Sequence, residues 1–168
     1  MRHTFLISAL LVGCTTAPLI SQSVPIPDTS IQDPKEGYQL WKEASIGNYR
    51  YIRESISAWC PGPDVQVTVI KNRVRSTEYL RDYTSCYDHS QRRSGENARR
   101  DYPTLAATVD DLFSEILEPN DGCRFDGGTF HPDYGFPLSA GRCGTLDDGT
   151  EIEDAGYGYR IVRFEILQ

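Results

Sequence analysis

The stretch FHPDYGFP, residues 130–137, gathers the residue types most able to do chemistry, because His131, Asp133 and Tyr134 stand close together in it. In a hydrolase, Asp133 would orient His131 as a general base, and a nucleophile and oxyanion donors would come from elsewhere. The same stretch also suits a hairpin turn, with proline and aspartate at the central positions and Gly135 in a left-handed conformation after them. We favour the turn, so these three side chains are binding candidates, and no catalytic residue is assigned.

Other catalytic and metal-binding signatures are missing from the sequence. It has no GxSxG, HExxH, CxxC or phosphate-binding loop motif. The acidic run DDGTEIED, residues 147–154, offers carboxylates to calcium, but it lacks the EF-hand spacing, and Asp148-Gly149 equally predicts a tight turn. We therefore expect no metal and no cofactor, and the sequence leans away from an enzyme.

The start of the chain predicts export and lipid attachment. Residues 1–13 combine a basic start with an apolar run, Phe5 to Val12, that is too short for the ~20 residues of a transmembrane helix. LVGC, ending at Cys14, resembles the lipobox of bacterial lipoproteins, which implies a lipid on this cysteine. Thr15 then favours the outer membrane, with the domain facing the periplasm. An ordinary cleaved signal with a chance cysteine is the alternative.

The remaining cysteines form an even set in a chain expected to be exported. This favours two disulfides over free thiols, and a zinc site is disfavoured because its paired short spacings are missing. Two of these cysteines lie almost symmetrically about FHPDYGFP, which favours their pairing across the hairpin and leaves the other two to pin a long loop. The expected pairs are Cys123 with Cys143 and Cys60 with Cys86.

Charge is unevenly distributed along the chain, whose net charge is −7. Residues 71–100 carry eight Lys or Arg against four acids, and residues 101–168 carry four against fourteen. The overall acidity argues against nucleic acid as a partner. The basic region suits anionic headgroups or an acidic protein, although interleaved acids make a solvated face the competing interpretation. Its candidate binding residues are Arg81, Arg92, Arg93, Arg99 and Arg100.

The periodicity of the remaining sequence predicts one folded domain over residues 33–168. Residues 14–32 are rich in proline, serine and threonine, which is typical of a flexible tether. A helix over residues 34–46 is expected, capped by Asp33. A second helix should begin after Thr108, whose partner in a reciprocal capping box would be Asp111.

Alternating apolar residues predict strands between and after these helices. Tyr49 and Tyr51 share a face, a valine strand over residues 65–69 follows, and Lys71-Asn72 is expected to form the next hairpin turn. Strands should flank FHPDYGFP and close the chain, where one face would carry Val162, Phe164 and Ile166. Because long βαβ crossovers are missing, the fold class is α+β, an antiparallel sheet with two helices packed on one face.

This succession resembles a family of small uncharacterised bacterial secreted and lipid-anchored proteins, classified as a domain of unknown function. The resemblance covers most of residues 38–168 through LWKEASIGNYRYIR, VTVIKNRV, TVDDLFSEI, FHPDYGFP and YRIVRFEIL. In that family aspartate commonly stands at the position of His131. The resemblance implies the fold but no activity. We therefore expect a lipid-anchored, non-catalytic envelope protein that binds an envelope partner, with an envelope hydrolase using His131, Asp133 and Tyr134, or a structural surface protein, as alternatives.

Overall fold

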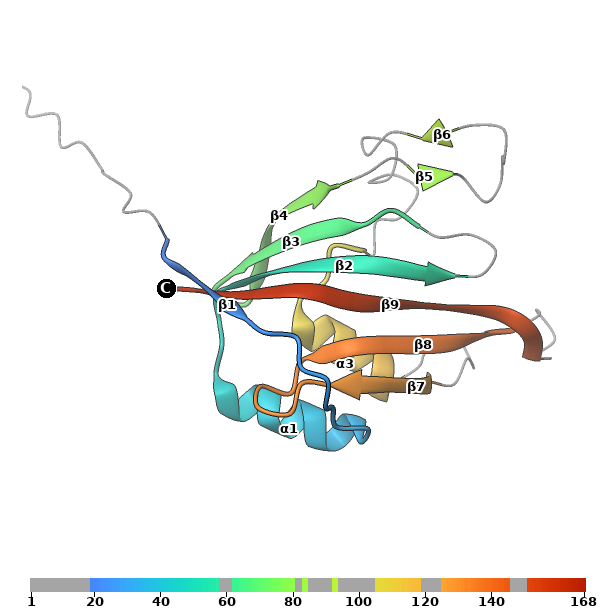
Figure 1. The fold of residues 1–168 in the computed structure, drawn as a ribbon, viewed down its shortest axis with the longest axis horizontal. Coiled ribbons are helices and arrows are strands. Elements are labelled where there is room, and N and C mark those ends of the chain that lie inside the picture. Colours follow the sequence, from blue (N-terminus) through green and yellow to red (C-terminus); the bar gives the residue numbers. More distant parts are fainter. Residues whose placement is uncertain are drawn as a thin grey trace, which may run out of the picture.

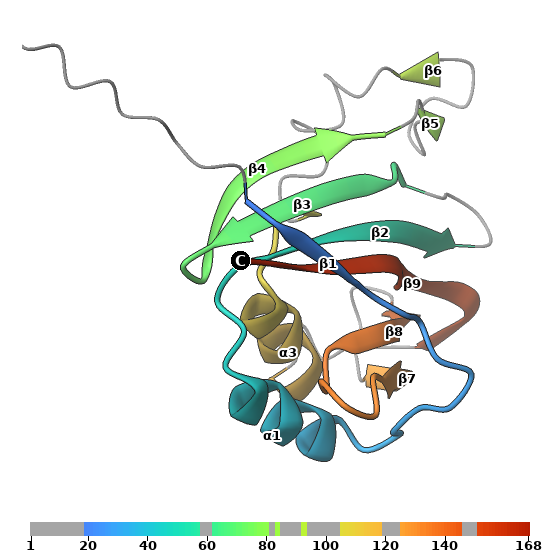
Figure 2. The same cartoon turned by 60° about the vertical axis from the view of Figure 1, so that its left-hand side comes forward.

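The computed structural model describes residues 19–57, 62–80, 83–84, 92–93, 105–118, 125–145 and 151–168. These residues form a seven-stranded antiparallel sheet in the order β4-β3-β2-β9-β8-β7, with β1 paired to β9 as well, and a separate two-stranded pair, β5-β6. Both helices lie on the same side of the curved sheet (Figures 1 and 2). The predicted α+β class is confirmed. The elements are β1 (Ser21–Val24), α1 (Pro34–Ala44), β2 (Tyr49–Ser57), β3 (Val65–Ile70), β4 (Arg73–Tyr79), β5 (Tyr83–Thr84), β6 (Arg92–Arg93), α3 (Val109–Leu117), β7 (Phe125–Phe130), β8 (Pro137–Thr145) and β9 (Glu151–Leu167).

Local capping explains where the two helices begin. The Asp33 side chain accepts the N–H of Lys35 at 2.9 Å, ahead of a proline at the first helical position. Thr108 and Asp111 form the predicted reciprocal capping box. Helix α1 ends two residues earlier than predicted, because Ser45 already adopts a left-handed conformation with φ 51°. No helix among the described residues has the length and apolar character needed to cross a bilayer.

The β3–β4 hairpin confirms the predicted turn at Lys71 and Asn72. Both residues are left-handed, with φ 52° and 57°, which is the geometry of a two-residue type I′ turn. The side chain of Asn48 accepts the N–H of Lys71 at 2.8 Å, and the carbonyl of Gly47 accepts that of Asn72 at 2.9 Å. These two bonds tie the turn to the start of β2, which helps a lysine to occupy a conformation that it seldom adopts.

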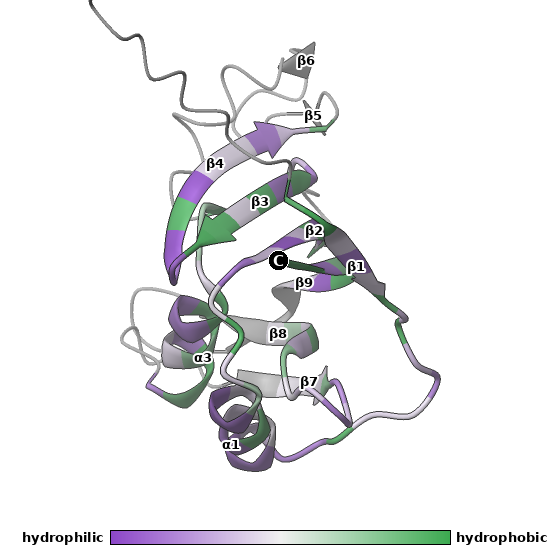
Figure 3. Ribbon diagram, turned by 90° about the vertical axis from the view of Figure 1, so that its left-hand side faces the viewer, coloured by the Kyte–Doolittle hydropathy of each residue, from purple (hydrophilic) through white to green (hydrophobic). Residues whose placement is uncertain are grey.

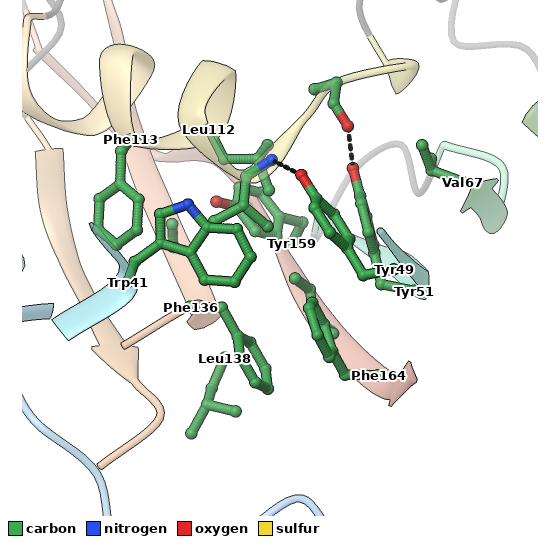
Figure 4. Close-up of a cluster of buried hydrophobic side chains, with 14 of the residues drawn as sticks. Trp41, Tyr49, Tyr51, Val67, Leu112, Phe113, Phe136, Leu138, Tyr159 and Phe164 are labelled. Atoms are coloured by element: carbon green, nitrogen blue, oxygen red, sulfur yellow. Dashed lines mark hydrogen bonds between the residues drawn. The ribbon is translucent and has the colours of Figure 1, made fainter. Parts of the chain in front are cut away.

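The core lies between the helices and the concave side of the sheet. Phe164 stacks on Phe136 and Tyr49 with centroid distances of 4.0 and 5.4 Å, and Trp41 of α1 meets Tyr49 edge-on. As Figure 4 shows, the Tyr49 hydroxyl accepts the N–H of Val109 and the Tyr51 hydroxyl donates to the carbonyl of Ala107. Burial raises the pKa of both phenols, so both remain protonated and anchor the start of α3 to β2.

Alternation along the strands separates this core from a second, outer face of the sheet. In β3 the valines at 65, 67 and 69 are buried and the residues between them are half-buried. Hydrophobic and polar residues accordingly alternate along β3 in Figure 3, and the edge strand β4 is mainly hydrophilic. The face opposite the helices is therefore the polar one.

Strand β9 departs from strict alternation at a β-bulge. Its register against β2 runs from Ile52↔Arg163 to Arg53↔Ile161, so Val162 has no opposite residue. Ile161 and Phe164 are buried, whereas Val162 is 38% exposed. The predicted shared face of Val162, Phe164 and Ile166 is therefore wrong at Val162.

The predicted tether is also corrected, because its second half belongs to the fold. Strand β1 pairs with residues 164–167 of β9, and Val24 is buried in the core. Ile31 forms a bridge with Phe130, and Ile20 exchanges two backbone hydrogen bonds with Gln168. The C-terminus accordingly lies beside β1 (Figure 1). Residues 21–24 are thus part of the sheet, although they precede the predicted domain boundary at residue 33.

Candidate functional site

The stretch FHPDYGFP forms the connection between β7 and β8, as the turn interpretation predicts. The N–H of Gly135 donates to the carbonyl of His131 at 2.8 Å, and the N–H of His131 donates to that of Phe136 at 2.9 Å. Gly135 is left-handed, with φ 74°. The connection packs closely on α1, because a Cβ added at Gly135 would lie 2.0 Å from the carbonyl oxygen of Gly37.

Both ring nitrogens of His131 take part in hydrogen bonds to the backbone. Its Nδ1 lies 3.1 and 3.3 Å from the backbone nitrogens of Asp133 and Tyr134, and its Nε2 lies 3.2 Å from the carbonyl oxygen of Pro25. Because a backbone N–H can only donate, Nδ1 must be the acceptor, and the proton must sit on Nε2. His131 is only 2% exposed. Neither nitrogen is left to take a proton from a substrate.

The three predicted binding candidates of this stretch therefore meet, but in a structural arrangement. Asp133 contacts His131 through its backbone N–H, and its side chain is exposed. The ring of Tyr134 packs beside the imidazole with a centroid distance of 5.1 Å. An aspartate at this position could accept the same two amides with its carboxylate. His131 performs that task with Nδ1 and adds a bond to the segment that follows β1.

This geometry predicts a pH-dependent stability. Burial lowers the pKa of His131, against smaller opposing effects of the Pro25 carbonyl and the Asp133 carboxylate. Above pH 6.5, which is about the pKa of histidine in an unfolded chain, His131 is neutral in both the folded and the unfolded protein. Below this pH, the unfolded chain takes up the proton more readily than the folded one does. The free energy of unfolding should therefore fall between about pH 7 and pH 5.

The His131→Asn variant tests this dependence, because asparagine keeps an acceptor for the turn and does not titrate. Urea unfolding across that pH range should give a steeper loss of stability for the native chain than for the variant. Parallel curves for the two proteins would show that His131 is not responsible.

A second group of polar side chains lies on the outer face of the sheet, where β2 and β9 pair. Glu165 accepts Arg50 Nε at 3.0 Å and Arg50 Nη2 on one oxygen, and Arg163 Nη2 at 2.6 Å on the other. In a neighbouring pair, Arg160 Nε donates to Glu54 at 2.6 Å. The hydrogen bond from Arg50 is the main reason that the pKa of Glu165 is lowered, so this carboxylate stays ionised at neutral pH.

These charges form a patch together with aliphatic side chains. The side chains of Arg160 and Arg163 are 60% and 59% exposed, while that of Glu165 is 4% exposed. Ile56 and Val162 are also exposed. We call this surface the outer-face patch, and it consists of Arg50, Ile52, Glu54, Ile56, Arg160, Val162, Arg163 and Glu165.

The outer-face patch was not predicted from the sequence. The available signal was the alternation in β2, where Arg50 and Glu54 occupy the face opposite Tyr49 and Tyr51. The ionic partner of Arg50 is 115 residues away in the sequence, so the pairing itself was invisible.

Other predicted site residues lie outside the described part of the chain. The predicted lipidation and disulfides stay predictions, because Cys14, Cys60, Cys86 and Cys123 are not described and only the backbone of Cys143, in β8, is. Of the basic region, Arg92 and Arg93 form β6 and pair with β5, while Arg81, Arg99 and Arg100 are not described. Within the described residues, no group of three or more His, Cys, Asp or Glu could hold a metal ion.

Comparison with known proteins gives one match. A family model described as a family of unknown function, DUF6174, matches residues 34–166. The matched range begins at the first residue of α1, ends one residue before the end of β9 and leaves out β1. No curated protein and no solved structure matches the chain.

Proposed function

The chain belongs to DUF6174, a family of unknown function, and we propose that it is a non-catalytic binding protein, held in the bacterial cell envelope by a lipid on Cys14. Membership agrees with the resemblance to an uncharacterised family. The envelope role, the anchor and the binding activity are the proposed part.

The observation that carries the proposal is the use of both nitrogens of His131. The one stretch whose residue types suggest catalysis holds a neutral imidazole between the turn amides and Pro25. A hydrolase that uses His131 as its general base would need one of the two ring nitrogens free of its structural hydrogen bond, and a nucleophile beside it. The outer-face patch, by contrast, presents exposed arginines and aliphatic side chains on rigid strands, which is a composition that protein interfaces favour.

The proposed anchor rests on the lipobox-like LVGC and on the short separation in sequence between Cys14 and the first described residues of the domain. Cys14 lies six residues before Ile20, whose backbone is hydrogen-bonded to Gln168. At about 3.3 Å per residue, this connection reaches roughly 20 Å. The lipid would therefore hold the domain close to the membrane surface, and Thr15 favours the periplasmic face of the outer membrane.

Replacing Cys14 by alanine tests the anchor. In cells fed a labelled fatty acid, the native chain should take up label and sediment with the outer membrane, and Cys14→Ala should lose both properties. A Thr15→Asp chain serves as the matched control, since it should keep the label and move towards the inner membrane. An unlabelled native chain, or a Cys14→Ala chain that still sediments with membranes, would overturn the anchor.

A further inference from the structure

We propose that the outer-face patch binds an extended, acidic segment of a partner protein, in which aspartate or glutamate occupies alternate residues. This inference rests on the proposed binding function but not on the lipid anchor. It names the chemistry of the partner and the strands that receive it.

The arginines of the patch are held in place before any partner arrives. Glu165 is buried and receives Arg50 and Arg163 on its two oxygens, and the half-buried Glu54 receives Arg160. The acids therefore lie at the base of the patch, and the guanidinium groups extend above them. Each of these contacts uses only part of the planar donor set of its arginine. The remaining donors suit a second carboxylate that approaches from solvent.

The spacing of the arginines matches the repeat of an extended segment. Across the outer face, Arg50 lies opposite Glu165, and the next two rows pair Ile52 with Arg163 and Glu54 with Arg160. Successive rows are two residues apart along β2, or roughly 6.6 Å. Alternate side chains of an extended segment repeat at the same distance. Carboxylates on such a segment would therefore meet Arg163 and Arg160 in turn.

The small net charge of the patch favours a short acidic segment over an anionic membrane surface. The patch contains three arginines and two glutamates, so its net charge is only +1 on a chain of net charge −7. One net basic charge raises binding to an anionic bilayer by only about fivefold, which is too little to hold a protein there. Beyond a Debye length of about 8 Å, that attraction is screened as well. Direct pairing with a few carboxylates, assisted by Ile56 and Val162, fits the patch better than a diffuse polyanion does.

The test uses the full-length Cys14→Ala chain and a fluorescent peptide of about ten residues, roughly 33 Å when extended, in which Asp alternates with Thr. One control peptide has the same composition with its aspartates in one block. The other control peptide has Asn in place of each Asp. Fluorescence anisotropy should show that the alternating peptide binds most tightly. Binding of the block peptide with equal strength, or no binding of the alternating peptide, would overturn the proposal.

The decisive variant is the double substitution Arg160→Gln/Arg163→Gln. It should weaken binding of the alternating peptide by about tenfold or more, because two charge-assisted contacts are lost. Lys35→Gln/Lys42→Gln changes the net charge equally on α1, on the other side of the sheet, and should leave binding unchanged. Circular dichroism establishes that each variant is folded. Equal losses in both variants would show a non-specific charge effect and overturn the proposal.

Two further measurements distinguish binding to a lipid surface, failure of the outer-face patch and failure of the proposed binding function. Vesicles rich in phosphatidylglycerol that bind the chain, with the same dependence on Arg160 and Arg163, would replace the acidic segment with a lipid surface. A photo-crosslinking residue at Val162, compared with one at Gln39 on α1, then probes native envelopes. Adducts at Gln39 alone would overturn the patch while keeping the binding function, and adducts at neither position would overturn both. Adducts at Val162 that map to an acidic extended segment would support the inference.

Discussion

Replacing Gly135 by alanine is expected to destabilise the domain by roughly 3–5 kcal/mol, because steric overlap adds to backbone strain. A new Cβ would lie 2.0 Å from the carbonyl oxygen of Gly37 and 2.6 Å from the backbone nitrogen of Trp41. Both atoms belong to the backbone of α1, so the overlap is relieved only if the helix and the hairpin separate. The left-handed φ of 74° at Gly135 adds its own strain for any residue with a Cβ.

Chemical unfolding followed by circular dichroism measures this effect, and Gly141→Ala is its matched control. A Cβ at Gly141 would meet only the carbonyl oxygen of Gly127 at 3.8 Å, an ordinary contact. The control should therefore change the free energy of unfolding by less than about 1 kcal/mol. If the two variants unfold at the same denaturant concentration, the close packing of the hairpin on α1 is incorrect.

Replacing Phe164 by alanine should have a similarly large effect, about 3–5 kcal/mol. Its ring is fully buried and stacks on Phe136 at 4.0 Å and on Tyr49 at 5.4 Å. Truncation removes these contacts and leaves a cavity that rigid neighbouring rings fill poorly.

Val162→Ala, two residues earlier on β9, is the control for this prediction. Val162 is 38% exposed because of the bulge, so its truncation should cost less than about 1 kcal/mol. Thermal or urea unfolding of both variants gives the comparison. Strict alternation along β9 would instead bury both side chains, and comparable losses of stability would show that the bulge is misplaced.

The features that sequence analysis predicted well are those whose causes lie within a few residues. Asp33, and Thr108 with Asp111, cap their helices through bonds that span two or three positions. The Lys71-Asn72 turn and the left-handed Gly135 likewise follow from local backbone preferences. Alternation in β3 then placed its valines in the core.

The features that it missed depend on contacts between distant parts of the chain. The bulge at Val162 reflects how β9 fits against β2, and nothing in the local sequence marks it. Residues 21–24 have a composition typical of a tether, yet they form a strand because β9 offers an edge beyond the end of β8. His131 is a turn acceptor whose second bond reaches Pro25, 106 residues earlier. Predicting the outer-face patch would likewise have required knowing that β2 pairs with β9, which lies more than 100 residues later.

The central position of β9 has a consequence for when this protein can fold. In the described sheet, β9 is the strand that joins β2 to β8, and it is also the strand with which β1 pairs. Before β9 is available, the β4-β3-β2 and β8-β7 sheets are separate, and β1 lacks this pairing. Such distant pairings form slowly, since long loops must close first. A nascent chain therefore cannot complete the described sheet until the seventeen residues of β9 have been synthesised.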